Sequence, residues 1–195
     1  MKLTREQLEK WMAHGYGWAA NGGVGTTPIT FAGAYDADAP DLFLHVPAGT
    51  TVIPFSIRVV YDAVGTEATM EIIGLASSTG DSSATGTAVT PKPLRTDNPG
   101  SQASLCTATV AVDAAGITDP NAGTFYEFWR FARPLTDTVA TTENDRWPLV
   151  FTWNAYVDGP PPIIAGGSLS VYAASQAGTG FIIAQWAEVP TGWLR

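Results

Sequence analysis

Residues 148–190 read PLVFTWNAYVDG, PPPIIAGGSLSVYAASQAGTG and FIIAQWAEVP, and this stretch predicts three β-strands. Along Leu149–Val157 every second residue is apolar, which is the period of two expected of a strand with one buried face. Three prolines follow Gly159 and lack the N–H group that a ladder needs, so the first strand must end there. Ser168–Ala173 alternates in the same way, and Phe181–Val189 supplies the third strand. We therefore expect the rest of the chain to pack on these strands.

From Pro28 onward the sequence predicts one strand after another. Turns rich in proline and glycine separate these runs. The sequence shows no internal repeat and no region of different amino-acid composition that would indicate a second domain. Eight or more strands in a single domain indicate an all-β sandwich or barrel. The predicted strands that precede residue 148 are Pro28–Phe31, Leu42–Val46, Thr51–Tyr61, Glu67–Leu75, Leu105–Val112 and Thr124–Arg133.

The clearest helix signal covers residues 3–14. Thr4 and Gln7 have the spacing of a capping box, and Leu8, Trp11 and Met12 then fall on one helical face. Three turns of helix are not stable alone in water, so this apolar face must dock on something. The alternatives are its own domain, a second subunit or a larger assembly, and we predict a contact outside its own sandwich.

A glycine-rich stretch, residues 15–25, follows the helix and predicts a flexible linker. The expected domain organisation is therefore a helical arm with its linker over residues 1–25 and a β-sandwich over residues 26–195. The N-terminus carries charges through Lys10 and has no apolar core of a signal peptide. No apolar run approaches the length of a membrane span, so we expect a soluble protein made in a cytoplasm.

The charge balance argues against a nucleic-acid partner. Charged residues make up 14% of the 195-residue chain, against roughly 25% in ordinary soluble proteins. The 18 acidic residues outnumber the 10 lysines and arginines, for a net charge of −8. Such a chain repels a phosphate backbone, and no cluster of basic residues offsets this locally.

The residues that usually carry catalysis are scarce. His14 and His45 are the only histidines, which excludes a site of three histidines, and no nucleophile motif accompanies them. Cys106 is the only cysteine, so it can form neither an intrachain disulfide nor a cysteine-based zinc site, and we expect a buried thiol. We therefore predict no catalytic residues, no metal and no cofactor.

Asp36, Asp38 and Asp41 form the one acidic cluster ahead of a predicted strand. A calcium site is the functional alternative. The spacing differs from a calcium-binding helix–loop–helix, because Pro40 stands where an oxygen ligand belongs and the glycine and final glutamate are missing. The expectation is therefore a solvated acidic loop.

Aromatic residues mark two strands as apolar on both faces. Along Thr124–Arg133, Phe125, Trp129 and Phe131 share one face while Tyr126 and Phe128 share the other. Phe181–Val189 is similar, with Ile182 and Trp186 opposite Phe181 and Ile183. Because a strand of a sandwich needs only one dry face, we predict that a subunit interface covers the second face. The alternatives are cover by the N-terminal helix and residues 88–100, or a carbohydrate platform of exposed rings. The predicted interface residues are Leu8, Trp11, Met12, Tyr126, Phe128, Ile182 and Trp186.

Four segments together give the chain a family resemblance: Leu42–Asp62, Pro91–Ser101, Phe125–Pro134 and Gly166–Pro190. In their order, their spacing and their low content of charged residues, these segments resemble jelly-roll head decoration (cement) proteins of tailed bacteriophages. They resemble the trimeric TNF-like sandwiches more loosely. The resemblance implies an all-β jelly-roll sandwich with a short N-terminal helical arm. It also implies a homotrimer that binds the major capsid protein on the virion exterior, after synthesis in the host cytoplasm, and stabilises the head.

Two other functions remain open at this point. One is a phage tail or host-recognition module that binds glycans through exposed aromatic residues, which burial of Trp129, Trp153 and Trp186 would weaken. The other is a carbohydrate-active enzyme on a β-sandwich, which a groove flanked by two close carboxylates would favour.

Overall fold

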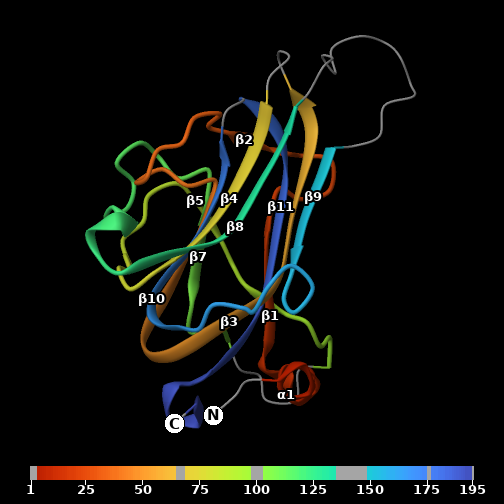
Figure 1. The fold of residues 1–195 in the computed structure, drawn as a ribbon, viewed down its shortest axis with the longest axis vertical. Coiled ribbons are helices and arrows are strands. Elements are labelled where there is room, and N and C mark those ends of the chain that lie inside the picture. Colours follow the sequence, from red (N-terminus) through yellow and green to blue (C-terminus); the bar gives the residue numbers. More distant parts are fainter. Residues whose placement is uncertain (1–3, 65–68, 98–102, 135–148, 175–176, 195) are drawn as a thin grey trace.

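The computed structural model describes residues 4–64, 69–97, 103–134, 149–174 and 177–194 (Figure 1). Helix α1 (Arg5–Trp11) leads through a wider helical turn (Met12–Tyr16) into the sheet, and two short 3₁₀ turns lie at Pro120–Ala122 and Thr191–Leu194. The described strands are β1 (Gly17–Gly22), β2 (Ile29–Phe31), β3 (Leu42–Val64), β4 (Thr69–Ser77), β5 (Thr87–Val89), β6 (Lys92–Pro93), β7 (Thr107–Val110), β8 (Phe125–Pro134), β9 (Leu149–Asn154), β10 (Ile164–Ala174) and β11 (Gly178–Pro190).

The long strand β3 belongs to both layers of the sandwich. Its first part, Leu42–Val46, pairs with β7 and β10, and its later part pairs with β11 and β9. Between the two parts the strand turns at Pro47–Gly49, where Gly49 has a φ of 86° that favours glycine. One layer has the order β5–β7–β3–β10–β4–β8 and the other β9–β3–β11–β1–β6, with every pair antiparallel.

The chain crosses from one layer to the other between successive long strands, as it does in a jelly roll. It crosses between β3 and β4, between β8 and β9, and between β10 and β11. The fold class expected from the sequence, an all-β antiparallel sandwich with a short N-terminal helix, is confirmed. The three strands predicted in residues 148–190 are β9, β10 and β11. In the part of the chain that is described, no helix is long and apolar enough to cross a membrane.

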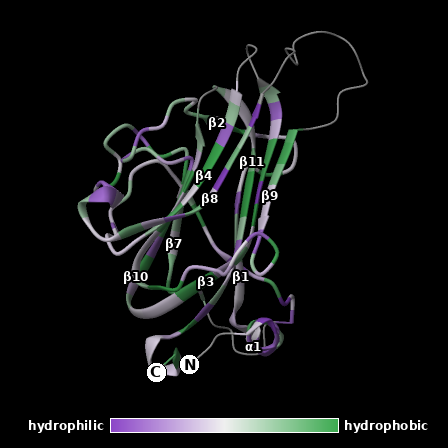
Figure 2. Cartoon of the chain, in the orientation of Figure 1, coloured by the Kyte–Doolittle hydropathy of each residue, from purple (hydrophilic) through white to green (hydrophobic). Residues whose placement is uncertain are grey.

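The core lies between the two layers and draws side chains from both. Figure 2 shows the hydrophobic residues concentrated along the long strands and the hydrophilic residues on α1 and the loops. In β9 the predicted alternation holds, since Leu149, Phe151 and Trp153 are buried while Thr152 is exposed. The largest fully buried side chains include Trp153, Trp186, Tyr172, Phe31, Phe43 and Met70.

Aromatic pairs close the sandwich along the edge formed by β8 and β9. The ring centroids of Phe128 and Trp153 are 4.9 Å apart, and those of Phe131 and Phe151 are 5.4 Å apart, both in edge-on geometry. Such pairs contribute roughly 0.5–1.5 kcal/mol each beyond the area that they bury. We call this edge the aromatic seam.

A bulge in β8 directs Phe128 into this seam. Opposite β8, Gly74 pairs with Trp129 and Leu75 pairs with Glu127, which leaves Phe128 as the extra residue. A side chain on Gly74 would lie 2.9 Å from Phe128 Cζ, so the glycine makes room for the ring. The sequence predicted that Phe128 shares an outer face with Tyr126, and this prediction is wrong. The bulge turns Phe128 toward Trp153 in the core.

The N-terminal helix docks on its own sandwich, which corrects the predicted external contact. Thr4 Oγ1 accepts a hydrogen bond from Gln7 N at 3.3 Å, as the capping pattern predicts. The apolar face of α1 packs on β3 and β11 of the same chain, where Leu8 and Trp11 join Ile53, Ala187 and Val189. The helix therefore finds its dry contact within the subunit.

The stretch expected as a linker is largely a strand. All six residues of β1 pair with β11, from Gly17 opposite Ala187 to Gly22 opposite Ile182. Trp18 and Ala20 are buried while Asn21 is exposed, so an alternation of period two is present among the glycines and alanines. The expected boundary between an arm and a sandwich at residue 25 does not match this pairing, because β1 is part of the sandwich.

We expect Trp11→Ala to lower the free energy of unfolding by about 3 kcal/mol, because it removes a buried ring from the contact between α1 and the sandwich. Chemical denaturation of the purified protein measures this change. Lys10→Ala is the matched control on the exposed face of the helix and should change the stability by less than about 0.5 kcal/mol. Equal stability of Trp11→Ala and the unmodified chain would contradict docking on the sandwich.

Candidate interaction surfaces

One end of β8 carries large apolar side chains into solvent. Phe125 is 50% exposed, Tyr126 58% and Ile163 54%. They line a shallow groove of about 300 Å³ between the start of β8 and the segment that enters β10. We call Phe125, Tyr126 and Ile163 the β8 patch. Contiguous apolar surface of this kind is typical of a site that another molecule covers.

The β8 patch lies on an edge strand with one ladder partner. Among the described strands β8 pairs only with β4, so its other edge leaves backbone N–H and C=O groups free to pair. Farther along β8, Arg130 contacts Glu71 and forms an ion pair with Glu127 at 2.7 Å between Nη2 and Oε2. The edge therefore has an apolar end and a charged middle, which limits the ways in which another surface can fit against it.

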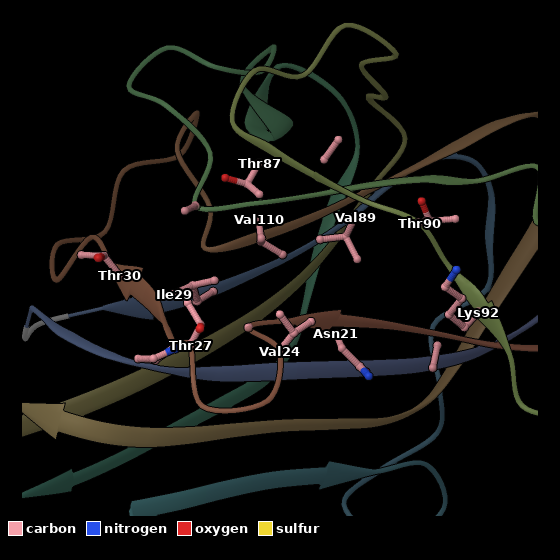
Figure 3. A pocket seen from close by; sticks show the side chains of 15 residues that line it. Asn21, Val24, Thr27, Ile29, Thr30, Thr87, Val89, Thr90, Lys92 and Val110 are labelled. Atoms are coloured by element: carbon pink, nitrogen blue, oxygen red, sulfur yellow. The ribbon is translucent and has the colours of Figure 1, made fainter.

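A second surface, a cleft of about 850 Å³, opens between β5 and the segment that runs from β1 into β2 (Figure 3). We call it the β5 cleft. Ile29, Val89 and Val110 lie toward its middle, with Lys92 at one end and Thr30 at the other. Its remaining lining residues are mostly threonine, alanine and glycine, and among the described residues Lys92 is the one charged member of the lining. The sequence analysis missed this cleft, since its walls come from segments some sixty residues apart.

Most of the predicted interface residues face their own chain. Ile182 and Trp186 have no exposed surface and lie in the central core, so they have nothing to offer a second subunit. The other side of β11 meets α1 through Ala187 and Val189, which is the cover by the N-terminal helix named above as an alternative. The expectation that Ile182 and Trp186 meet a second subunit is therefore corrected, because both lie in the core of their own chain, and α1 covers the Ala187–Val189 end of the other face.

The remaining predicted interface residues divide into three groups. Leu8 and Trp11 are buried under the docked helix, and Met12 is half-buried beside them. Phe128 is half-buried in the aromatic seam. Tyr126 is the member of the set that is exposed, and it lies in the β8 patch.

The three tryptophans considered for a carbohydrate platform are buried. Trp129 lies in the core beside β4, Trp153 in the aromatic seam, and Trp186 in the centre of the sandwich. A flat, exposed indole ring is what stacking on a sugar requires. Burial of these three rings therefore weakens the glycan-binding alternative.

Asp41 is a buried structural carboxylate and does not join Asp36 and Asp38 in a cation site. Its Oδ1 accepts a hydrogen bond from Ala32 N at 2.9 Å, and its Oδ2 accepts one from Ala173 N at 2.6 Å. Burial raises the pKa of Asp41 to about 6, although these two hydrogen bonds act in the opposite direction. Asp36 is exposed, and a hydrogen bond with Asp38 raises its pKa. Within the described ranges no three His, Cys, Asp or Glu side chains are close enough to hold a metal ion.

Glu188 is a buried carboxylate that the sequence analysis missed. Its oxygens accept hydrogen bonds from Ser104 Oγ at 2.6 Å and Leu105 N at 2.7 Å, and Trp186 Nε1 lies 3.4 Å away. These contacts hold the segment before β7 against the end of β11. Burial, followed by the nearby Glu188 charge, raises the pKa of the Cys106 thiol far above its ordinary value. Cys106 is therefore an inert buried thiol, as expected.

The raised pKa of Asp41 predicts how the free energy of unfolding changes with pH. Because the folded state holds the proton more tightly than the unfolded state, the contribution of Asp41 is greatest at low pH and is lost as the pH rises through about 6. Between about pH 4.5 and about pH 7.5 the stability of the unmodified chain relative to Asp41→Asn should fall by about 2 kcal/mol. Urea denaturation of both proteins at the two pH values checks this, and a relative stability that rises with pH would contradict it.

Comparison with known proteins yields no family for this chain. No family model matches the sequence, and no curated protein matches it. Among solved structures, the infectious bursal disease virus VP2 subviral particle aligns with 91% of this chain at 13% identity and a TM-score of 0.19. The chain spans 43% of the length of that VP2 chain. A likeness of this size is too weak to bear on fold or function.

Proposed function

We propose that this chain is a non-enzymatic structural protein of a tailed-phage virion. In this proposal it is a decoration protein that forms homotrimers and binds the major capsid protein on the outside of the head. The observation that carries the proposal is the β8 patch, an exposed apolar surface on a strand edge. The resemblance of the chain's segments to decoration proteins supplies the virion context.

The composition of the β8 patch favours a protein partner. Phe125 and Tyr126 offer large rings with few rotatable bonds, and Ile163 adds an aliphatic side chain across the groove. Aromatic residues are enriched at the centres of protein interfaces, where charged residues are depleted. At about 25 cal/mol per Å², covering the exposed halves of these three side chains would stabilise an interface by several kcal/mol.

A decoration protein binds a surface that repeats over the whole head, so several modest contacts can act together. A trimer presents each of its surfaces three times, and simultaneous contacts raise the effective affinity without any new contact within a subunit. The net charge of −8 disfavours the packaged DNA as a partner and is compatible with a position on the capsid exterior.

We expect light scattering at micromolar concentration to give three times the chain mass of 20.5 kDa. Tyr126→Glu places a charge in the β8 patch and should convert the trimer into a folded monomer, with an unchanged circular dichroism spectrum because the side chain is exposed. Val157→Glu, at a still more exposed apolar residue between β9 and β10, is the control and should remain trimeric. A monomeric unmodified chain, or a trimeric Tyr126→Glu, would overturn the assigned interface.

Binding to heads tests the virion role directly. The purified protein should sediment with expanded empty phage heads and saturate at a fixed number of copies per capsomer. Tyr126→Glu should bind at least about tenfold more weakly than Val157→Glu, since a monomer loses the gain from multiple contacts. Absence of saturable binding to expanded heads would refute the decoration role.

A further inference from the structure

The β5 cleft lies at one edge of the sandwich, where no large side chain of its described lining residues fills the space between the two layers. On the opposite edge, rings from β8 and β9 meet across the aromatic seam. On this edge β5 ends one layer, and β1 with the short β6 ends the other. The residues that β1 and β5 contribute to the lining include small ones, such as Ala19 and Thr87, and the space beside them remains open.

The walls of the cleft offer backbone groups to a further strand. Within the described part of the chain, β5 pairs only with β7 and β2 pairs only with β11. β6 pairs with β1 only through Trp18 and Ala19, so the same edge of β1 continues past it at Asn21. Strand edges with free N–H and C=O groups are templates for the addition of an extended peptide.

The side chains of the cleft indicate the chemistry of such a peptide. Thr27, Thr30, Thr87 and Thr90 provide hydroxyl groups around a floor of Ile29, Val89 and Val110. This mixture suits small β-branched side chains that alternate between an apolar floor and solvent. None of the described residues that line the cleft is aromatic, and they therefore offer no ring on which a sugar could stack.

The charge of Lys92 indicates which charge a ligand of the cleft should carry. In the described part of the chain Lys92 is the one charged residue of the lining, and it lies at one end of the cleft. Among the described residues no ion pair involves Lys92, whereas Lys10 pairs with Glu6 at 2.9 Å. A positive charge at the end of a groove in an otherwise acidic chain complements a carboxylate.

We propose that the β5 cleft binds an extended segment of another polypeptide, which adds as a strand along β5 and places a carboxylate at Lys92. The inference is independent of the virion role, because it rests on the cleft and not on the β8 patch. Three residues of β5 provide the template, so the contact is short and its affinity modest.

Fluorescence anisotropy with three labelled, C-terminally amidated heptapeptides tests the proposal. The sequence TVTVTVD should bind saturably to the full-length protein below about 1 mM. TVTVTVN, which lacks the carboxylate, should bind about threefold to fivefold more weakly, as expected for one exposed ion pair. PPPPPPD keeps the charge but has no N–H groups to donate along its first six residues, and it should not bind.

Protein variants locate the binding. Thr87→Trp adds a large ring at an exposed position of the lining, on the same face of β5 as Val89, and should abolish binding of TVTVTVD. Lys92→Gln should reproduce the loss seen with TVTVTVN, while Lys10→Gln, the matched control on α1, should not. Binding of PPPPPPD equal to that of TVTVTVD, binding unchanged by Thr87→Trp, or no peptide binding at 1 mM would each overturn the proposal. Binding of maltoheptaose in place of the peptides would assign the cleft to a carbohydrate and overturn it as well.

Discussion

The backbone pairing of β3 is the constraint on which the rest of the structure depends. A buried strand must satisfy its N–H and C=O groups on both edges, and β3 does so with β7 and β10 in its first part and with β9 and β11 in its second. Because one strand lies in both layers, the turn at Pro47–Gly49 sets how the layers face each other. The core fills the space that this turn encloses.

The two edges of the sandwich differ because their side chains differ in size. Sheets that pack face to face lie about 10 Å apart, a gap that aromatic rings from two strands can bridge. Phe128 and Phe131 do this with Trp153 and Phe151. At the other edge alanine, threonine and valine are too short to meet, and the β5 cleft remains.

The two candidate surfaces occupy opposite ends of one layer. In the order β5–β7–β3–β10–β4–β8 the β5 cleft belongs to the first strand and the β8 patch to the last. An extended segment bound at one edge would therefore leave the other edge free for a second copy. The buried carboxylates, Asp41 and Glu188, serve a different purpose, since each fixes a loop by accepting backbone hydrogen bonds.

The sequence by itself determined the features that depend on near neighbours. The period of two in β9 and the cap at Thr4 involve residues a few positions apart, and both are present as predicted. The sequence also placed Tyr126 in an interface; its side chain is exposed, and its place in an interface stays a prediction. Tertiary structure alone decided where α1 docks, how the bulge opposite Gly74 turns Phe128 inward, and which strand edges meet at the β5 cleft. These outcomes depend on contacts between residues far apart in the chain, for which local periodicity carries no signal.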